Sequence, residues 1–267
     1  MKFLYDEMSW PEVKQAVKDD RLAILPVGTC EQHGPHLPLR TDFFVCYEVC
    51  KKVGQELPTD VVVLPPVNYG YNEHHLDFPG TIHIDHETFT RFLICIGKSL
   101  AYHGFKRILI VNGHGSNTAL CEFASKRITL ETNAMCASAI YLAFGWDKVR
   151  EILEAETSHA CELETSLMLH LASELVDMSK AVRDVSYPES KYIRYGWSPK
   201  YKTLAIAGGN VQFIDWWSRL SKTGTMGDPT KATKEKGKKI FDAIVNDMVE
   251  FIKEFKSREA PPRKDHH

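Results

Sequence analysis

Side chains that can bind metal ions gather in residues 28–42, which read GTCEQHGPHLPLRTD. Glu31 and His33 are separated by one residue, so in an extended chain they point to opposite sides and each could serve a different ion. Asp42 lies nine residues past His33, at the expected start of a helix, where it could contact both ions. A carboxylate bridging two ions about 3.5–4 Å apart is a recurrent feature of hydrolytic two-metal sites.

Two further clusters carry the same side-chain types. The segment NGHGSN at 112–117 places His114 between two glycines, whose small size would let the ring and a substrate approach closely. The segment SHACELETS at 158–166 adds one histidine and two glutamates: His159, Glu162 and Glu164. Mixed histidine and carboxylate ligands suit Zn²⁺, Mn²⁺ or Fe²⁺ and do not suit a calcium site.

Each cluster also has an ordinary alternative interpretation. A single His-Gly-Pro-His loop is more often a turn than a metal site, and a glycine-rich strand end is often a simple turn. His159 could be a residue at a helix N-terminus that bonds to the backbone. Together the clusters favour a metal site, because each falls where a predicted strand ends or a predicted helix begins.

Strands and amphipathic helices are predicted to alternate around these clusters. Apolar or β-branched runs predict strands at 22–27, 61–64, 107–111 and 134–141. Helical periodicity with start and stop signals predicts helices at 9–18, 43–57, 86–103, 118–132, 160–175 and 230–255. This order predicts one α/β domain over 1–257, with a mainly parallel sheet sandwiched by helices and an active site at the carboxyl ends of the strands. Residues 182–227 are expected to form long loops and short strands, and 258–267 a flexible tail.

Composition argues against several classes of protein. The net charge is -2, and basic and acidic residues are interspersed along the sequence. The sequence therefore lacks the concentrated positive charge that is typical of proteins that bind nucleic acid or a membrane surface. The chain has no run of 18 apolar residues and no apolar signal-peptide core near its start, so we expect a cytoplasmic protein. The seven cysteines lack a paired CxxC pattern, and buried free thiols are expected. Neither GxGxxG nor GxxxxGK[ST] occurs between a strand and a helix, which disfavours a nucleotide-binding module.

The motifs, taken in order, resemble the creatininase (creatinine amidohydrolase) family. The resemblance covers residues 9 to about 175, and a weaker similarity extends to residues 221–229 and the final helix. It is carried by LPVGTCEQHGPHLPLRTD at 25–42, FPGT at 78–81, VNGHGSN at 111–117 and HACELETSLML at 159–169. The resemblance implies a creatininase-like α/β fold, two divalent metal ions, and hydrolysis of a C–N bond in a small cyclic amide or formamide by a hydroxide that bridges the ions.

The resemblance also implies metal ligands. Carried over to this chain, the first site would use Glu31, Asp42 and His114, and the second would use His33 and the shared Asp42. A glutamate that completes the second site in creatininase is replaced here by Ser116, a poor substitute for a carboxylate.

Two glutamates of the third cluster could fill this gap. We expect Glu162 to complete the second site and to take part in catalysis, while Glu164, which matches a family glutamate, could be a ligand or support one. On a helix these two side chains point about 200° apart, so only one of them should face the ions.

The resemblance implies further roles. His159 matches the family's catalytic histidine and would move protons from the attacking water to the leaving group. Tyr71, His75 and Ser116 are expected to contact the substrate, together with His74, although the residues before FPGT could equally form a surface loop.

The substrate is left open by the sequence. Creatininase has a tryptophan-containing lid before its catalytic histidine, and this chain reads LEAETSHACE there, so we expect a family member other than creatininase. One alternative is ring-opening C–C hydrolysis of a cyclic diketone such as a diketo-inositol. Another is a metal-binding protein without catalysis, suggested by Ser116. Zn²⁺ is the expected ion, with Mn²⁺ or Fe²⁺ possible, and a homo-oligomer, by resemblance a hexamer, is expected. The aromatic and basic segment at 192–202 could bind a polar ring or form subunit contacts.

Overall fold

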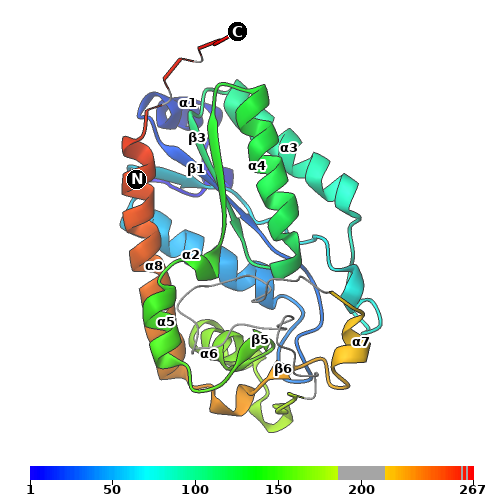
Figure 1. Ribbon diagram of the computed structural model, residues 1–267. Helices are drawn as coiled ribbons and strands as arrows, with labels where there is room; N and C mark the ends of the chain where they lie inside the picture. The colour runs from blue at the N-terminus through cyan, green and yellow to red at the C-terminus, as the bar shows by residue number, and fades with distance from the viewer. Residues whose placement is uncertain (186–213, 260, 263) are drawn as a thin grey trace.

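Four parallel strands form the central sheet of the computed structural model, which describes residues 1–185, 214–259, 261–262 and 264–267. The strand order is β2-β1-β3-β4. The strands are β1 (Leu22–Val27), β2 (Val61–Val63), β3 (Arg107–Asn112) and β4 (Met135–Ile140). Pairing is in parallel throughout, with Leu25 opposite Ile110 in the centre of the sheet. The carboxyl ends of β1 and β3 therefore lie side by side (Figure 1).

Helices cover both faces of this sheet. One face packs against α1 (Trp10–Lys18), α3 (His86–Tyr102) and α4 (Thr118–Glu131). The other packs against α2 (Thr41–Glu56), α5 (Trp146–Ile152), α6 (Glu162–Leu171) and α8 (Lys234–Ser257). Figure 1 shows α3 and α4 on the opposite side of the sheet from α8 and α5. The predicted α/β fold with a helix-sandwiched parallel sheet is confirmed.

The continuous apolar run of β1 follows from this arrangement. Leu22 and Ile24 are fully buried against the helices of one face, while Ala23 and Leu25 are buried against those of the other. A strand buried on both faces has no reason to alternate with polar residues. Burying each large aliphatic side chain contributes about 1.5–3 kcal/mol. These strands are therefore the rigid base from which the polar loops emerge.

A smaller layer lies beyond the carboxyl ends of the main strands (Figure 1). It contains the antiparallel pair of β5 (Thr157–His159) and β6 (Met226–Gly227), together with the short helix α7 (Trp217–Leu220). Single turns of 3₁₀-helix connect the other elements: η1 (Tyr5–Glu7), η2 (Glu73–His75), η3 (Gly115–Asn117), η4 (Tyr141–Ala143), η5 (Ser173–Leu175), η6 (Met178–Lys180) and η7 (Pro229–Lys231).

Several predicted helix boundaries were wrong, among them the start of α2 at Thr41 and the end of α6 at Leu171, and two wrong starts have clear local reasons. α6 begins at Glu162 and not at residue 160, because Ala160 has a left-handed φ of 51° that no helix accepts. α8 begins at Lys234 and not at residue 230, because Thr233 caps it by accepting a hydrogen bond from the Lys236 amide. The short elements α5, α7, β5 and β6 were not predicted individually. The predicted loop region 182–227 contains α7 and β6, and its part 186–213, which includes 192–202, lies outside the described residues.

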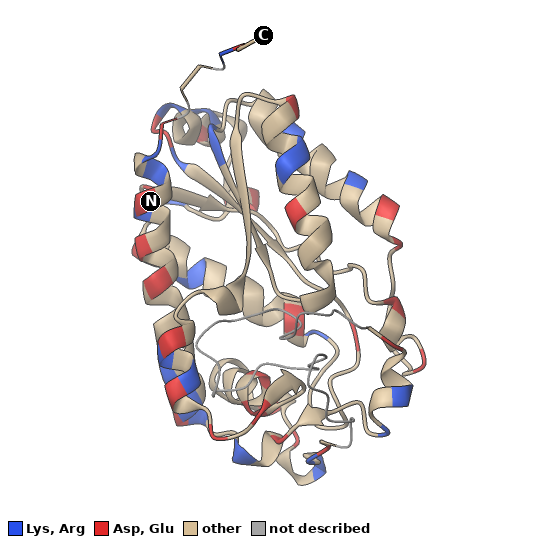
Figure 2. Ribbon diagram, in the orientation of Figure 1, with Lys and Arg blue, Asp and Glu red and all other residues tan. Residues whose placement is uncertain are grey.

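Charge and exposure agree with the expectations from composition. Lysine, arginine and acidic residues are interspersed along the outer helices, including α3, α4 and α8 (Figure 2). Among the described residues, no helix is long and apolar enough to cross a membrane. All seven cysteines are free, and four are buried as predicted, whereas Cys95 is exposed. The described residues after Ser257 are exposed and extend away from the body of the protein (Figure 1).

Candidate metal centre

Glu31 carries a buried carboxylate with no hydrogen-bond partner on either oxygen. It follows β1, and imidazole nitrogens from three other segments face its Oε1 atom. His114 Nδ1 lies 3.3 Å away, His75 Nε2 3.4 Å and His159 Nδ1 3.7 Å. A fully buried carboxylate without donors is costly unless a cation balances its charge. The environment of Glu31 therefore fits a metal ion.

Asp42 contacts two histidines through its two carboxylate oxygens. It lies in the first turn of α2, where its Oδ1 is 2.9 Å from His33 Nε2 and its Oδ2 is 2.9 Å from His114 Nδ1. The Thr29 hydroxyl donates a 2.7 Å hydrogen bond to Oδ2 and fixes the carboxylate orientation. Asp42 therefore lies between His33 and His114 and contacts both.

Three overlapping groups of buried side chains are close enough to hold ions. Ligand atoms within each group lie within 4.8 Å of one another: Glu31, His33 and His159; Glu31, Asp42 and His114; His33, Asp42 and Glu164. Each of Glu31, His33 and Asp42 belongs to two groups. This sharing is what two adjacent cations would require, and the mixed imidazole and carboxylate donors suit first-row divalent metals.

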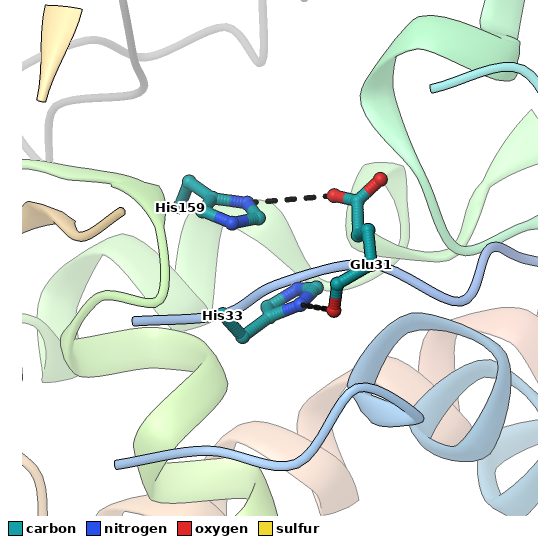
Figure 3. Close-up of side chains that lie close together, drawn as sticks. All are labelled: Glu31, His33 and His159. Carbon is teal, nitrogen blue, oxygen red and sulfur yellow. Dashed lines mark hydrogen bonds and ion pairs between the residues drawn. The ribbon is translucent and has the colours of Figure 1, made fainter. Parts of the chain in front are cut away.

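His159 presents one free ring nitrogen to this cluster. Its side chain points toward the Glu31 carboxylate, with the His33 ring beneath it (Figure 3). The two imidazole ring centres are 4.2 Å apart. On its other side, Nε2 lies 2.7 Å from the Gln32 carbonyl oxygen and donates to it, which leaves Nδ1 without a proton. Burial, with the charge of His33, lowers the pKa of His159 well below its ordinary value, so the ring is neutral and can accept a proton.

The opposite charges of the cluster shift the pKa values of its members apart. Burial opposes the charged form of each histidine, but the neighbouring carboxylates outweigh it and raise the pKa of His33 to about 9 and that of His114 to about 10. Burial also opposes ionisation of Asp42, yet the two imidazoles hold the pKa of that carboxyl well below its usual range. Burial raises the pKa of Glu164 to about 7. In the absence of metal, protonated His33 and His114 therefore supply the positive charge that balances the buried carboxylates.

Glu162 lies outside all three groups, so this geometry does not favour its predicted roles as metal ligand and catalytic group. Its buried carboxylate accepts hydrogen bonds from the backbone amides of Glu154 and Ala155 and pairs with Lys236 at 2.5 Å. Glu164, two residues along the same helix, points the other way and joins the cluster. Only Glu164 of the two glutamates therefore faces the cluster, and it replaces Glu162 as the candidate ligand on this helix.

The three predicted substrate contacts have different surroundings. His75 is buried beside Glu31, and its Nδ1 accepts a 2.9 Å hydrogen bond from the Gln32 side chain. The Ser116 hydroxyl lies 3.2 Å from His74 Nε2, and the His74 ring stacks on His114 with centres 5.9 Å apart. The Tyr71 ring packs edge-on against His83 and His86. This placement gives no support to a substrate contact by Tyr71.

The sequence interpretation missed two residues that contact the cluster. Gln32 contacts both His75 and His159. It lies in the sequence between Glu31 and His33, and this position next to two predicted ligands is the signal that could have identified it. Trp217 lies with its ring centre 4.5 Å from that of His75 and 5.0 Å from that of His159. Its indole N–H donates a 2.9 Å hydrogen bond to the Gly224 carbonyl. No periodic pattern surrounds Trp217, so no sequence signal could have placed it here.

Comparison with known proteins agrees with this arrangement. The family model described as "Creatininase: Creatinine amidohydrolase" matches residues 6–252. The mycofactocin precursor peptide peptidase of Mycolicibacterium smegmatis is 32% identical over 87% of this chain and 84% of its own length. The creatinine amidohydrolase of Pseudomonas putida is 28% identical over 96% of each chain. The 3-dehydro-scyllo-inosose hydrolase of Thermotoga maritima is 26% identical over 95% of this chain and 84% of its own.

Solved structures give the same result. A structure described as "Creatininase Mn" aligns with a TM-score of 0.80 and 25% identity, over 97% of this chain and 100% of the other. A creatininase variant described as the Zn-Zn type aligns with a TM-score of 0.77 and 25% identity over the same shares. The family model spans nearly the whole described body, including all three polar clusters. The chain therefore belongs to the creatininase family of metal-dependent hydrolases.

Proposed function

We propose that this protein hydrolyses a C–N bond of a small cyclic amide or formamide with two divalent cations. Glu31, Asp42 and His114 would hold the first cation, and His33, Asp42 and Glu164 the second. The single observation that carries the proposal is the buried Glu31 carboxylate, which no hydrogen-bond donor satisfies and which shares its histidines with Asp42. Glu164 takes the place first expected for Glu162. Zn²⁺ is our first expectation for both positions.

The cations, when bound, supply a water of lowered pKa as nucleophile and an electrostatic partner for negative charge on the carbonyl oxygen. The chain itself supplies proton transfer. His159 Nδ1 would take a proton on the side of Glu31 and return it to the departing nitrogen, because Nε2 is already committed to the Gln32 carbonyl. His75 and Trp217 cover the imidazole of His159 and limit the access of bulk water.

A second candidate reaction is ring-opening C–C hydrolysis of a cyclic diketone. Its support is the 26% identity to the 3-dehydro-scyllo-inosose hydrolase. A diketone needs the same polarised carbonyl and the same attacking water, so the residues of the cluster would keep their roles. The difference lies in the leaving group, which is an enolate carbon in place of an amide nitrogen.

A substrate panel tests these proposals. Metal-free protein loaded with Zn²⁺, Mn²⁺ or Fe²⁺ would be assayed by NMR for product formation from hydantoin, dihydrouracil, an N-formylated aminopyrimidine, a short peptide amide and a cyclic 1,3-diketone. Metal content would be measured on the same samples. We expect two ions per chain and turnover of a cyclic amide or the formamide. Turnover of the diketone alone would support the second reaction, and two bound ions without any turnover would contradict both.

We also propose that the protein forms a homo-oligomer. Support comes from large apolar side chains on the outer surfaces of α3 and α4, where Phe92, Phe123 and Leu130 are all more than half exposed. Exposed apolar groups of this size are common at subunit contacts. Light scattering coupled to size-exclusion chromatography would give the mass in solution, and a monomer at micromolar concentration would contradict this proposal.

A further inference from the structure

The contacts of the Glu162 carboxylate form a fixed anchor for the segment that leads into β5. Its Oε2 accepts hydrogen bonds of 2.9 Å from the Glu154 amide and 2.8 Å from the Ala155 amide. Its Oε1 pairs with Lys236 Nζ at 2.5 Å. The Glu162 side chain is 0% exposed, and the Lys236 side chain is 16% exposed. Both oxygens of a completely buried carboxylate are therefore satisfied by three charge-assisted contacts.

Lys236 reaches this carboxylate from a different part of the fold. It lies in the first turn of α8, and its ammonium also contacts the Lys231 carbonyl at 2.9 Å and Glu154 Oε1 at 2.6 Å. The following residue, Gly237, allows α8 to approach α6, because a Cβ atom there would overlap the Ser166 carbonyl oxygen. The packing of the two helices therefore fixes the distance between Lys236 and Glu162.

The segment held by this pair ends at His159. Residues 154–155 lead directly into β5, whose last residue is His159. Immediately after it, the Ala160 amide donates a 2.5 Å hydrogen bond to Glu164 Oε2, and Ala160 adopts its left-handed φ of 51°. Two carboxylates of the first turn of α6 thus hold the backbone on both sides of His159. A non-glycine residue in this conformation persists only where its surroundings enforce it.

We propose that the Glu162–Lys236 ion pair is a positioning device that holds His159 Nδ1 toward the metal centre. This inference rests on the proposed function, in which His159 transfers protons. Neither partner belongs to the three ligand groups, so the pair acts through the backbone of 154–159 and not through a metal ion. A displacement of about 1 Å of a catalytic group can reduce turnover about 100-fold, so the anchor matters for rate more than for binding.

Variants of the two partners test the inference. Glu162→Gln, Lys236→Met and the double variant would be compared with Lys238→Met, which removes an exposed ion pair with Asp242 from the same helix. Hydrogen exchange of the Glu154 and Ala155 amides, the His159 ring resonances and metal content would be measured on metal-loaded protein. For any panel substrate that turns over, kcat and KM would be determined.

We expect both single variants to exchange the two amides at least about tenfold faster and to shift the His159 resonances, with metal content unchanged. We expect kcat to fall between about 10- and 100-fold with KM changed less than about twofold. The double variant should be no worse than the worse single variant, Lys236→Arg should retain most activity, and Lys238→Met should match the parent protein.

Unchanged His159 resonances, or unchanged kcat despite faster amide exchange, would overturn the inference. Loss of metal in Glu162→Gln would also overturn it, in favour of a ligand role. If the Gln and Met variants fail to fold, Glu162→Asp, which shortens the carboxylate by one methylene and draws it away from the Glu154 and Ala155 amides, must still shift the same resonances. Unshifted resonances in Glu162→Asp would count against the inference. If no panel substrate turns over in the parent protein, the proposed function fails, while the exchange and resonance measurements still test the anchor.

Discussion

Asp42 and His114 lie 72 residues apart in the sequence, yet Asp42 Oδ2 is 2.9 Å from His114 Nδ1. The contact joins the first turn of α2 to the loop after β3. The second carboxylate oxygen makes an equal contact with His33, so one side chain connects the ligands of both proposed cation positions. Loss of this connection should therefore affect the whole centre.

Asp42→Asn should abolish both cation positions. The amide is neutral and has one oxygen in place of two, so it can neither balance nor bridge two cations. We expect metal affinity to fall at least about 100-fold at both positions, with activity lost in parallel. Thr29→Val, which removes only the hydrogen bond to Oδ2, is the control and should cost about tenfold. Elemental analysis after dialysis measures the occupancy, and retention of one ion by Asp42→Asn would show that Asp42 does not bridge.

Glu164→Gln should empty the second position selectively. Glu164 is grouped with His33 and Asp42, whereas Glu162 pairs with Lys236 on the other side of α6. We expect one ion per chain in Glu164→Gln and two in Glu162→Gln, read by elemental analysis or by anomalous scattering from crystals. Ser116→Ala should retain two ions, because the Ser116 hydroxyl contacts His74. Loss of the second ion from Glu162→Gln, but not from Glu164→Gln, would instead support Glu162 as the ligand that completes the second position.

The main elements and most of the clustered polar side chains could be predicted because they depend on short-range patterns. Apolar runs such as β1 specify buried parallel strands, and the loops that follow them must meet at one edge of the sheet. Glu31, His33, Asp42 and His114 were therefore placed together from their positions in the sequence, and the structure brings them together.

The choice between Glu162 and Glu164 could not be predicted, because it depends on tertiary packing. Both occur in the first turn of one helix, and which of them faces the cluster is set by the rotation of α6 against α8. Lys236, which neutralises the outward-facing glutamate, lies 74 residues further along the chain. Trp217 was missed for a similar reason, since its position depends on the contact of α7 with the loop around Gly224.

Metal binding should release protons. In the metal-free protein the pKa of His33 is raised to about 9 and that of His114 to about 10, so at pH 7.5 each imidazole carries about one proton more than its neutral form. Ligation requires neutral imidazole, so loading releases these protons and apparent affinity rises with pH until about pH 9–10. Titration calorimetry with Zn²⁺ in buffers of different ionisation enthalpy would count the protons. A pH-independent affinity between pH 6 and 9 would contradict the electrostatic description of the site.

Trp217→Ala should weaken substrate binding. The indole contacts the His75 and His159 rings and is only partly buried, so it lies on the solvent side of these two buried histidines. An aromatic contact is worth about 0.5–1.5 kcal/mol, which predicts an increase in KM of about 2- to 12-fold. Trp217→Phe should lose less. Trp10→Ala, at a residue 77% exposed in α1, is the matched control and should leave KM unchanged. Steady-state kinetics would measure KM for each variant. An unchanged KM in Trp217→Ala would show that Trp217 does not contact the substrate.

Gly113→Ala should damage both stability and metal binding, whereas Gly115→Ala should damage neither. A Cβ atom on Gly113 would lie 2.6 Å from the Asp42 carbonyl oxygen and 2.9 Å from Cys46 Cβ, so the first turn of α2 would have to move away from β3. A Cβ atom on Gly115 would meet no atom within 4 Å. Overpacking of this kind costs about 1–3 kcal/mol. Because the displaced turn carries Asp42, we expect metal occupancy to fall together with the midpoint of thermal unfolding. Full occupancy in Gly113→Ala would show that α2 can shift without disturbing the centre, and the close packing of Gly113 against α2 would then have no role in positioning Asp42.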